Sequence, residues 1–170
     1  RTRRRWRSSG ADTTTTASTG PLFFGVESVS LAADDTNEIL YIAAQFDIYA
    51  WPFNDPNPPV LLVSPVDPSN GNAIRCEAMA FGQGRLFAVE EFNTTGPEGI
   101  YEIDLSTGDA TPVYLFPDDT IDIGGLSYNS ATGTFFGTND SSTYPSGTGI
   151  VEFDILGAVQ TETFIASYPT

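Results

Sequence analysis

Apolar and polar residues alternate in short runs along most of the chain, and clusters of Gly, Asn, Asp, Ser and Thr separate these runs. The clearest unit is the segment GIYEIDLSTGDATPVYL, from Gly99 to Leu115. Its two β-rich halves flank Ser106-Thr107-Gly108-Asp109, where a glycine among small polar residues supplies the positive φ of a tight turn. The pattern therefore predicts a β-hairpin. One hairpin cannot bury its own apolar face, so neighbouring units of the same kind are expected.

The hairpin is part of a pattern of four short strands that occurs three times from residue 24 onward. The repeat has a period of about 50 residues, which is typical of propeller blades. The aligned positions are Val29, Met79 and Leu126 in the first strands, and Ile48, Ile100 and Ile150 in the third strands. The predicted strands are 25–33, 39–44, 47–51 and 60–66; then 76–82, 85–91, 99–105 and 111–117; then 123–129, 133–140, 149–155 and 161–167.

Two segments carry a resemblance to a known class of repeat. LSYNSATGTFFGTND (126–140) and EIDLSTGDATPV (102–113) resemble the degenerate β-propeller repeats common in bacterial secreted and surface proteins, in which an Asp-x-Ser-Thr-Gly turn joins the third and fourth strands. The likeness covers roughly residues 24–170 and is poor in the first copy, where FNDPNPP (53–59) replaces the tight turn. The resemblance implies a fold and transfers no catalytic residue, because known members include enzymes, binding platforms and structural proteins.

The expected fold is all-β: an Arg/Thr-rich flexible arm at residues 1–22, then a β-propeller-like repeat domain at 23–170 with blades at about 24–70, 73–119 and 121–170. Closed single-chain propellers have about 4–8 blades, so three would leave faces and edges open. The chain is then part of a longer product, or is completed by copies or partners, or packs its sheets as a prism or sandwich. We favour an incomplete propeller whose open faces are covered by another chain.

Charge is divided unevenly along the sequence. The formal net charge is −15, yet five of the seven basic residues lie within the first seven positions. From residue 8 onward only Arg75 and Arg85 oppose 22 carboxylates. An acidic body repels phosphate backbones, so no nucleic acid is expected to bind the folded part. The basic arm is either a solvated terminus or a segment that docks on an acidic partner or a neighbouring subunit.

Several classes of catalyst are disfavoured by composition. The chain has no His and no Lys, which removes imidazole acid–base chemistry and the commonest metal ligand. Cys76 is the single cysteine and lies next to Glu77, whose charge disfavours a thiolate, so we expect Cys76 to pack in the core. Glu90 and Glu91 are adjacent in a strand and point to opposite faces, so they cannot form a glycosidase pair by themselves. No enzymatic activity is expected, and a carboxylate-based glycosidase or lyase is the least favoured reading.

The candidate binding residues follow from the repeat. Glu27 and Glu77 occupy equivalent places at the start of first strands, where they would line a central channel. Asn139 and Asp140 follow a second strand, and Tyr144 lies in the long loop after it. Loops between second and third strands vary most, and such loops usually share one binding face in propellers. The predicted binding face therefore contains Glu27, Glu77, Asn139, Asp140 and Tyr144.

Calcium is the only cofactor that the sequence suggests. Asp118, Asp119 and Asp122 form a cluster of hard oxygen ligands of the kind that Ca²⁺ prefers. Their spacing matches neither an EF-hand loop nor a repeat-type calcium motif.

The expected function is a non-enzymatic structural or interaction subunit that binds protein partners, or further copies of itself, through its blades and long loops. The alternative is a secreted carbohydrate- or calcium-binding module. No run approaches the roughly 18 apolar residues of a membrane span, so none is expected. The expected location is extracytoplasmic or secreted, with an organelle lumen as the alternative, because the Arg- and Ser-rich start resembles part of a targeting segment without its apolar region.

Overall fold

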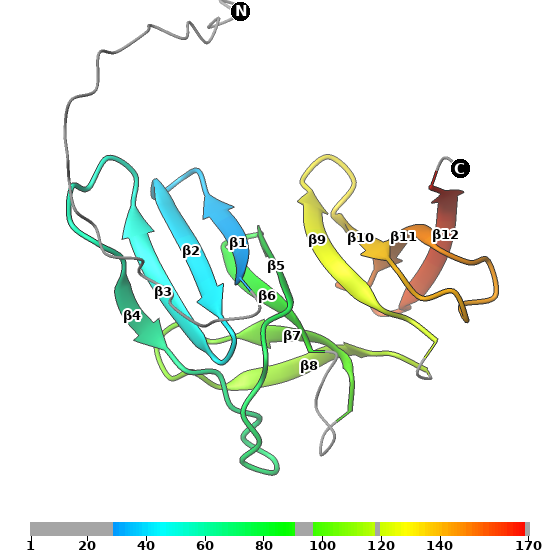
Figure 1. Ribbon diagram of the computed structural model, residues 1–170, viewed down its shortest axis with the longest axis horizontal. Helices are drawn as coiled ribbons and strands as arrows, with labels where there is room; N and C mark the ends of the chain where they lie inside the picture. The colour runs from blue at the N-terminus through cyan, green and yellow to red at the C-terminus, as the bar shows by residue number, and fades with distance from the viewer. Residues whose placement is uncertain (1–28, 91–96, 118–119, 169–170) are drawn as a thin grey trace, which may run out of the picture.

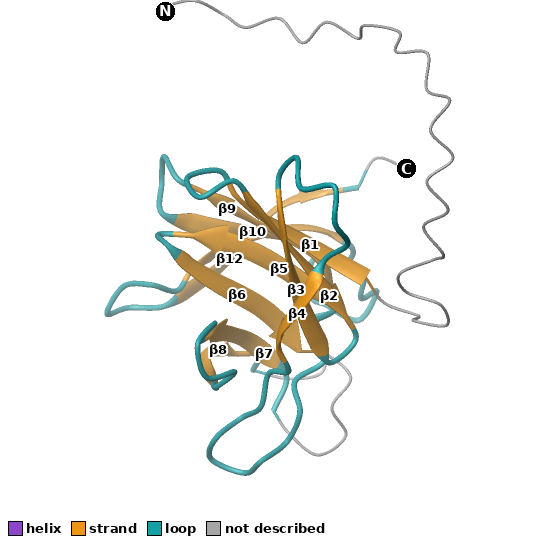
Figure 2. Ribbon diagram, turned by 90° about the vertical axis from the view of Figure 1, so that its left-hand side faces the viewer, coloured by secondary structure: helices purple, strands orange, loops and turns teal. Residues whose placement is uncertain are grey.

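The computed structural model describes residues 29–90, 97–117 and 120–168. This part of the chain is all-β, with strands in three four-stranded antiparallel sheets and no helix among the residues that are described (Figures 1 and 2). Each sheet uses four consecutive strands paired in chain order. The all-β class and the three groups of four strands are therefore confirmed, and we call each sheet a blade.

Blade 1 contains β1 (Val29–Asp34), β2 (Ile39–Ala44), β3 (Asp47–Pro52) and β4 (Val60–Val63). Blade 2 contains β5 (Ala78–Gly82), β6 (Arg85–Glu90), β7 (Gly99–Ile103) and β8 (Ala110–Leu115). Blade 3 contains β9 (Ile123–Asn129), β10 (Thr134–Asn139), β11 (Gly149–Asp154) and β12 (Thr161–Ser167).

The blades share one irregularity at the same place, between the third and fourth strands. The register shifts directly after the isoleucine that the sequence aligns in all three repeats: at Ile48/Tyr49, Ile100/Tyr101 and Ile150/Val151. A β-bulge increases local twist and bends the strand that carries it. The repeat is therefore reproduced in backbone detail, and the third-strand alignment is confirmed.

The first-strand alignment needs a correction in the first copy. Leu31, Met79 and Leu126 lie opposite equivalent residues of the second strands, so Leu31 and not Val29 is the counterpart of Met79. The reason is turn length. Four residues connect the paired ends Asp34 and Ile39, whereas only Gln83 and Gly84 separate the paired ends of β5 and β6.

The blades fan around their innermost strands, with β5 packed between β1 and β9 (Figure 1). We call the two sides of a blade its leading face and its trailing face. The trailing face of blades 1 and 2 packs against the leading face of the next blade, and the equivalent sides of blades 1 and 3 that point outward keep the same names. One core lies between the trailing face of blade 1 and the leading face of blade 2, and a second core lies between blades 2 and 3. The first core includes Tyr41, Ile48, Met79, Leu86, Tyr101 and Ile103. The second core includes Phe87, Val89, Ile100, Phe135, Val151 and Phe153.

Aromatic side chains connect the blades at both interfaces. Tyr41 of blade 1 stacks on Phe81 of blade 2 with ring centroids 5.5 Å apart. Phe87 of blade 2 meets Phe135 of blade 3 edge to face at 4.8 Å. Such pairs add about 0.5–1.5 kcal/mol beyond the area that they bury. In both interfaces an aromatic residue near the start of a second strand contacts the next blade.

The predicted hairpin of blade 2 is confirmed. The Asp104 carboxylate accepts hydrogen bonds from the backbone N–H of Ser106 at 2.8 Å and from its hydroxyl at 2.6 Å. Gly108 has the positive φ that the turn needs, at 85°. The linker from blade 1 then pairs with the start of β8, because Val66 donates to Gly108 O and accepts from Ala110 N–H, both at 2.9 Å. This pairing covers part of an edge strand.

A substitution at Gly82 tests the packing between blades 2 and 3. A Cβ atom at this position would lie 2.4 Å from Cγ of the Tyr128 ring, so Gly82→Ala forces the ring or the strand to move. We expect a loss of about 1–3 kcal/mol of unfolding free energy, measured by chemical denaturation. Gly157→Ala is the matched control, because its Cβ would meet only an ordinary contact at 3.8 Å. Equal stability of the two variants would contradict this interface.

Candidate functional site

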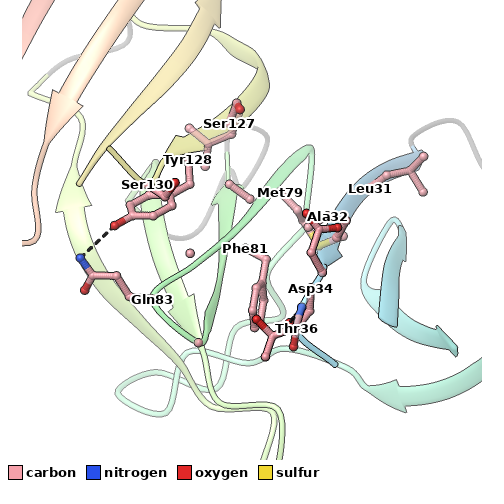
Figure 3. Close-up of a pocket in the computed structure, with 16 residues that line it drawn as sticks. Leu31, Ala32, Asp34, Thr36, Met79, Phe81, Gln83, Ser127, Tyr128 and Ser130 are labelled. Carbon is pink, nitrogen blue, oxygen red and sulfur yellow. Dashed lines mark hydrogen bonds between the residues drawn. The ribbon is translucent and has the colours of Figure 1, made fainter. Parts of the chain in front are cut away.

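A groove of about 620 Å³ runs along the three innermost strands (Figure 3). It opens at the end of the blades where the first strand turns into the second. Its lining is mostly polar, since each of these turns contributes small polar residues. The residues with functional groups here are Asp34, Asp35, Thr36, Gln83, Ser127, Tyr128 and Ser130. In a closed propeller this groove would form one mouth of the central channel.

Asp34 is 2 % exposed and shapes one wall of the groove. Its carboxylate accepts from the Thr36 and Asn37 backbone N–H groups at 3.0 and 3.1 Å, and from the Asn37 side chain at 2.7 Å. Burial acts to raise the Asp34 pKa, but these hydrogen bonds outweigh it and hold the pKa below its ordinary value of 3.8. Asp34 is therefore a charged turn residue whose acceptors are occupied by its own turn.

The opposite wall connects blades 2 and 3. Gln83 Nε2 donates a hydrogen bond to the Tyr128 hydroxyl at 2.9 Å (Figure 3). Gln83 has a positive φ of 52°, in the two-residue turn between β5 and β6. Its side-chain carbonyl accepts from Arg85 at 3.1 Å. These contacts fix the polar groups that a ligand in the groove would meet.

Glu77, one of the two residues that the sequence predicts for the channel, is not among the residues that line this groove. Glu77 precedes β5 and forms an ion pair with Arg75, with Nε and Oε1 2.6 Å apart. Its carboxylate is largely covered, with 13 % of the side chain exposed. Glu27 lies outside the described residues. The convergence of these two carboxylates on a channel stays a prediction.

Asn139 holds the long loop of blade 3 from inside. It is 0 % exposed, its side-chain carbonyl accepts from Asp122 N–H at 2.9 Å, and its amide donates to Gly147 O at 3.1 Å. Glu90 occupies the same place in blade 2, where its carboxylate accepts from the Arg75 backbone N–H. In both blades, a hydrogen bond to this side chain therefore connects the end of the second strand to the backbone just before the innermost strand.

The other two predicted binding residues belong to the same long loop. Asp140 is exposed and accepts a hydrogen bond from the Tyr168 hydroxyl at 3.3 Å. Tyr144 packs against Phe164 with centroids 6.0 Å apart and donates to Glu162 at 2.7 Å. The Tyr114 hydroxyl of blade 2 donates to the second oxygen of Glu162, also at 2.7 Å. Asn139 thus ends β10, and Asp140 and Tyr144 lie in the loop that follows. Tyr144 also packs against the core between blades 2 and 3.

The calcium prediction is mostly outside the described structure. Asp118 and Asp119 lie outside the described residues, and Asp122 is exposed at the start of β9. Among the residues that are described, no group of three or more His, Cys, Asp or Glu side chains is arranged to hold a metal ion.

Cys76 lies in the core between blades 1 and 2 and is 0 % exposed. Burial, followed by the charges of Glu90 and Glu77, raises the pKa of its thiol far above the ordinary value of 9.0. The expected core position is therefore observed.

The two outermost blade faces are the other candidate sites. The leading face of blade 1 carries apolar residues from all four strands, and several are strongly exposed: Leu31 by 57 %, Leu61 by 53 % and Trp51 by 37 %. The cross-strand register places Leu40 opposite Trp51, and Ile42 between Leu31 and Tyr49. Contiguous exposed apolar faces of this kind are uncommon on monomeric soluble proteins.

The equivalent positions in the first three strands of blades 2 and 3 lie in or beside the two cores. These three strands of blade 1 therefore have the residue pattern of a blade face that is buried in the other two blades. The register aligns Leu31 with Met79 and Leu126, Leu40 with Leu86 and Phe135, Ile42 with Ala88 and Gly137, Tyr49 with Tyr101 and Val151, and Trp51 with Ile103 and Phe153.

The trailing face of blade 3 is the second outermost face. It contains a shallow hollow of about 300 Å³ with a mainly apolar lining, to which Gly125, Ser127, Phe136, Thr138 and Ile150 contribute. The sequence located the variable loops but neither face, because deciding which residues share a face requires the register and the bulges.

Comparisons of the chain with protein-family models, with curated proteins and with solved structures found no match. In the described part of the chain, no helix is long and apolar enough to cross a membrane. The architecture therefore rests on the three repeated sheets.

The reactivity of Cys76 provides a test of the first interface. We expect the native protein to resist a thiol reagent such as iodoacetamide at pH 8 and to react fully in denaturant, because reaction needs an accessible thiolate. Mass spectrometry of the labelled protein measures the modified fraction. Rapid labelling of the native chain would contradict the packing of Cys76 between blades 1 and 2.

The turn at Asp34 gives a pH-dependent prediction. A carboxyl group whose pKa is lowered by folding stabilises the folded state above its ordinary value of 3.8, and this contribution is lost as pH falls through the lower folded pKa. We expect Asp34→Asn to cost about 1–3 kcal/mol at pH 7 and progressively less below pH ~3.8. Denaturation curves at several pH values measure the difference. Asp35→Asn, at an exposed neighbouring position, is the control, and an equal loss in both variants would refute the assignment.

Proposed function

We propose that this protein is a non-enzymatic interaction subunit that binds protein through its outermost blade faces. The observation that carries the proposal is the leading face of blade 1. Leu31 and Trp51 are exposed at positions whose counterparts in blades 2 and 3 pack against a neighbouring blade, and Leu61 is exposed on the same face. Covering one such side chain contributes about 1.5–3 kcal/mol, so a partner that covers the whole face would bind stably.

The non-enzymatic part of the proposal is supported by composition and by burial. The chain has no His or Lys to act as a base near neutral pH. Its one thiol is buried, with a raised pKa. Tyr101 is similarly unsuited to proton transfer, because burial together with Asp67 and Glu90 raises its pKa to about 12.

A second candidate function is favoured by the groove. Its volume of about 620 Å³ and its polar lining suit a polar ligand such as a carbohydrate, with Phe81 and Tyr128 as aromatic surfaces beside it. Retention of the protein on immobilised glycans, lost in Tyr128→Ala, would support this function. Unchanged melting with Ca²⁺ or EDTA, together with no glycan retention, would count against a carbohydrate- or calcium-binding module.

The interaction proposal is tested by particle mass and by dye binding. Light scattering should find a multimer, or else a monomer that increases the fluorescence of a dye specific for apolar surface. Leu31→Glu should abolish the assembly or reduce dye binding several-fold, because it places a charge on the leading face of blade 1. Val159→Glu is the matched control, since Val159 is 76 % exposed in the turn before β12 and should tolerate the charge. A monodisperse monomer that binds no dye would refute the proposal.

A further inference from the structure

The two outermost faces are related to each other through the repeat. Within the chain, a trailing face always packs against the leading face of the next blade. Blade 1 has an outward leading face and blade 3 an outward trailing face, which are the two halves of one such interface. This inference rests on the proposed function: we propose that the protein partner of this chain is a second copy of the same chain. Blade 3 of one copy packs on blade 1 of the other, so that two copies close a six-bladed ring.

The trailing face of blade 3 keeps the residues that make the internal interfaces. An aromatic residue stands at the same place in every blade: Tyr41, Phe87 and Phe136. The first two contact the following blade directly. The isoleucine before each bulge is also shared, and Ile48 and Ile100 lie in the two cores. Phe136 and Ile150 are half-buried on blade 3 and are thus placed to contact a fourth blade.

The two faces also match in size. Gly125 leaves room on the trailing face of blade 3, where blade 2 has Ala78, and it lines the hollow on that face. The leading face of blade 1 is correspondingly larger at one central position, where Ile42 replaces Ala88 and Gly137. Volume added on one side of an interface is tolerated where the other side gives room.

The geometry of the contact limits the assembly. A head-to-tail contact between identical chains either closes into a ring or continues as a filament. Two copies supply six blades, which lies within the range of about 4–8 found in closed propellers. Three copies would supply nine, outside that range. A dimer is therefore the expected particle.

Charge distinguishes this contact from one made by the basic arm. Each copy has a formal charge of −15, so two copies repel each other at low ionic strength. Apolar contact between blade faces should therefore strengthen when salt screens the repulsion. A contact that depends on the N-terminal arginines would weaken under the same conditions.

A crosslinking experiment tests the contact between two specific residues. Phe87 and Phe135 meet between blades 2 and 3, with ring centroids 4.8 Å apart. At the proposed contact, Phe136 of one copy takes the place of Phe87, and Leu40 of the other copy takes the place of Phe135. A mixture of Leu40→Cys and Phe136→Cys chains, treated with a short bismaleimide, should give one dimeric product on a denaturing gel. Each variant alone should give no crosslinked product. In a ring of two copies, the two identical cysteines lie at opposite interfaces and are too far apart for the reagent. Val159→Cys mixed with Leu40→Cys is the control at an exposed site.

The particle mass of the unmodified chain, measured by light scattering at low and high salt, gives a second test that does not depend on the cysteine variants. A dimer that strengthens with salt, together with the mixed crosslink, supports the ring. Crosslinking of Leu40→Cys to itself, or long polymers, overturns it. A monomer that binds an apolar dye also overturns it and leaves the proposed function with a different partner. A monomer that binds no dye refutes both.

Discussion

The structure depends on one constraint: a four-stranded sheet has two faces, and each apolar face needs a cover. Blade 2 has both faces covered, with Leu86 and Tyr101 against blade 1 and Phe87 and Ile100 against blade 3. Stacking similar units in this way packs the innermost strands against one another, and the same bulge occurs in each unit. The end blades satisfy the constraint on one face only, and the outward face of each has no neighbouring blade among the residues that are described.

Local pattern was sufficient to predict that the strands exist and to give most of their bounds, although the strand predicted at 60–66 ends at Val63 in β4. The runs at 39–44, 123–129 and 161–167 match β2, β9 and β12, because alternation and glycine-containing turns act over a few residues. Pairing acts over longer distances. The alignment of Val29 with Met79 was displaced by two residues, since a β1–β2 turn longer than the β5–β6 turn is invisible to a comparison of strand sequences.

The candidate site was harder to predict for a related reason. Asn139 and Tyr144 have the chemistry of ligand-binding residues, yet their polar groups are used inside the protein, on the Gly147 carbonyl and on Glu162. A sequence shows which groups a residue offers but not which neighbours use them. The polar residues of the groove were missed because most of them lie in or next to the short turns after the innermost strands, where their sequence indicates only a turn.

The position of Cys76 in the chain of interfaces has a consequence for how the molecule comes apart. In a linear array, stability is approximately a sum of units and nearest-neighbour contacts, and end units with a single neighbour open at lower free energy than the middle one. Cys76 is sealed by the interface of blades 1 and 2 alone. The thiol of Cys76 therefore becomes accessible when blade 1 separates from blade 2. The slowest amide hydrogens of blade 2 exchange only when the whole protein unfolds. The difference between the free energy of opening at Cys76 and the free energy of global unfolding measures the cooperativity of the array.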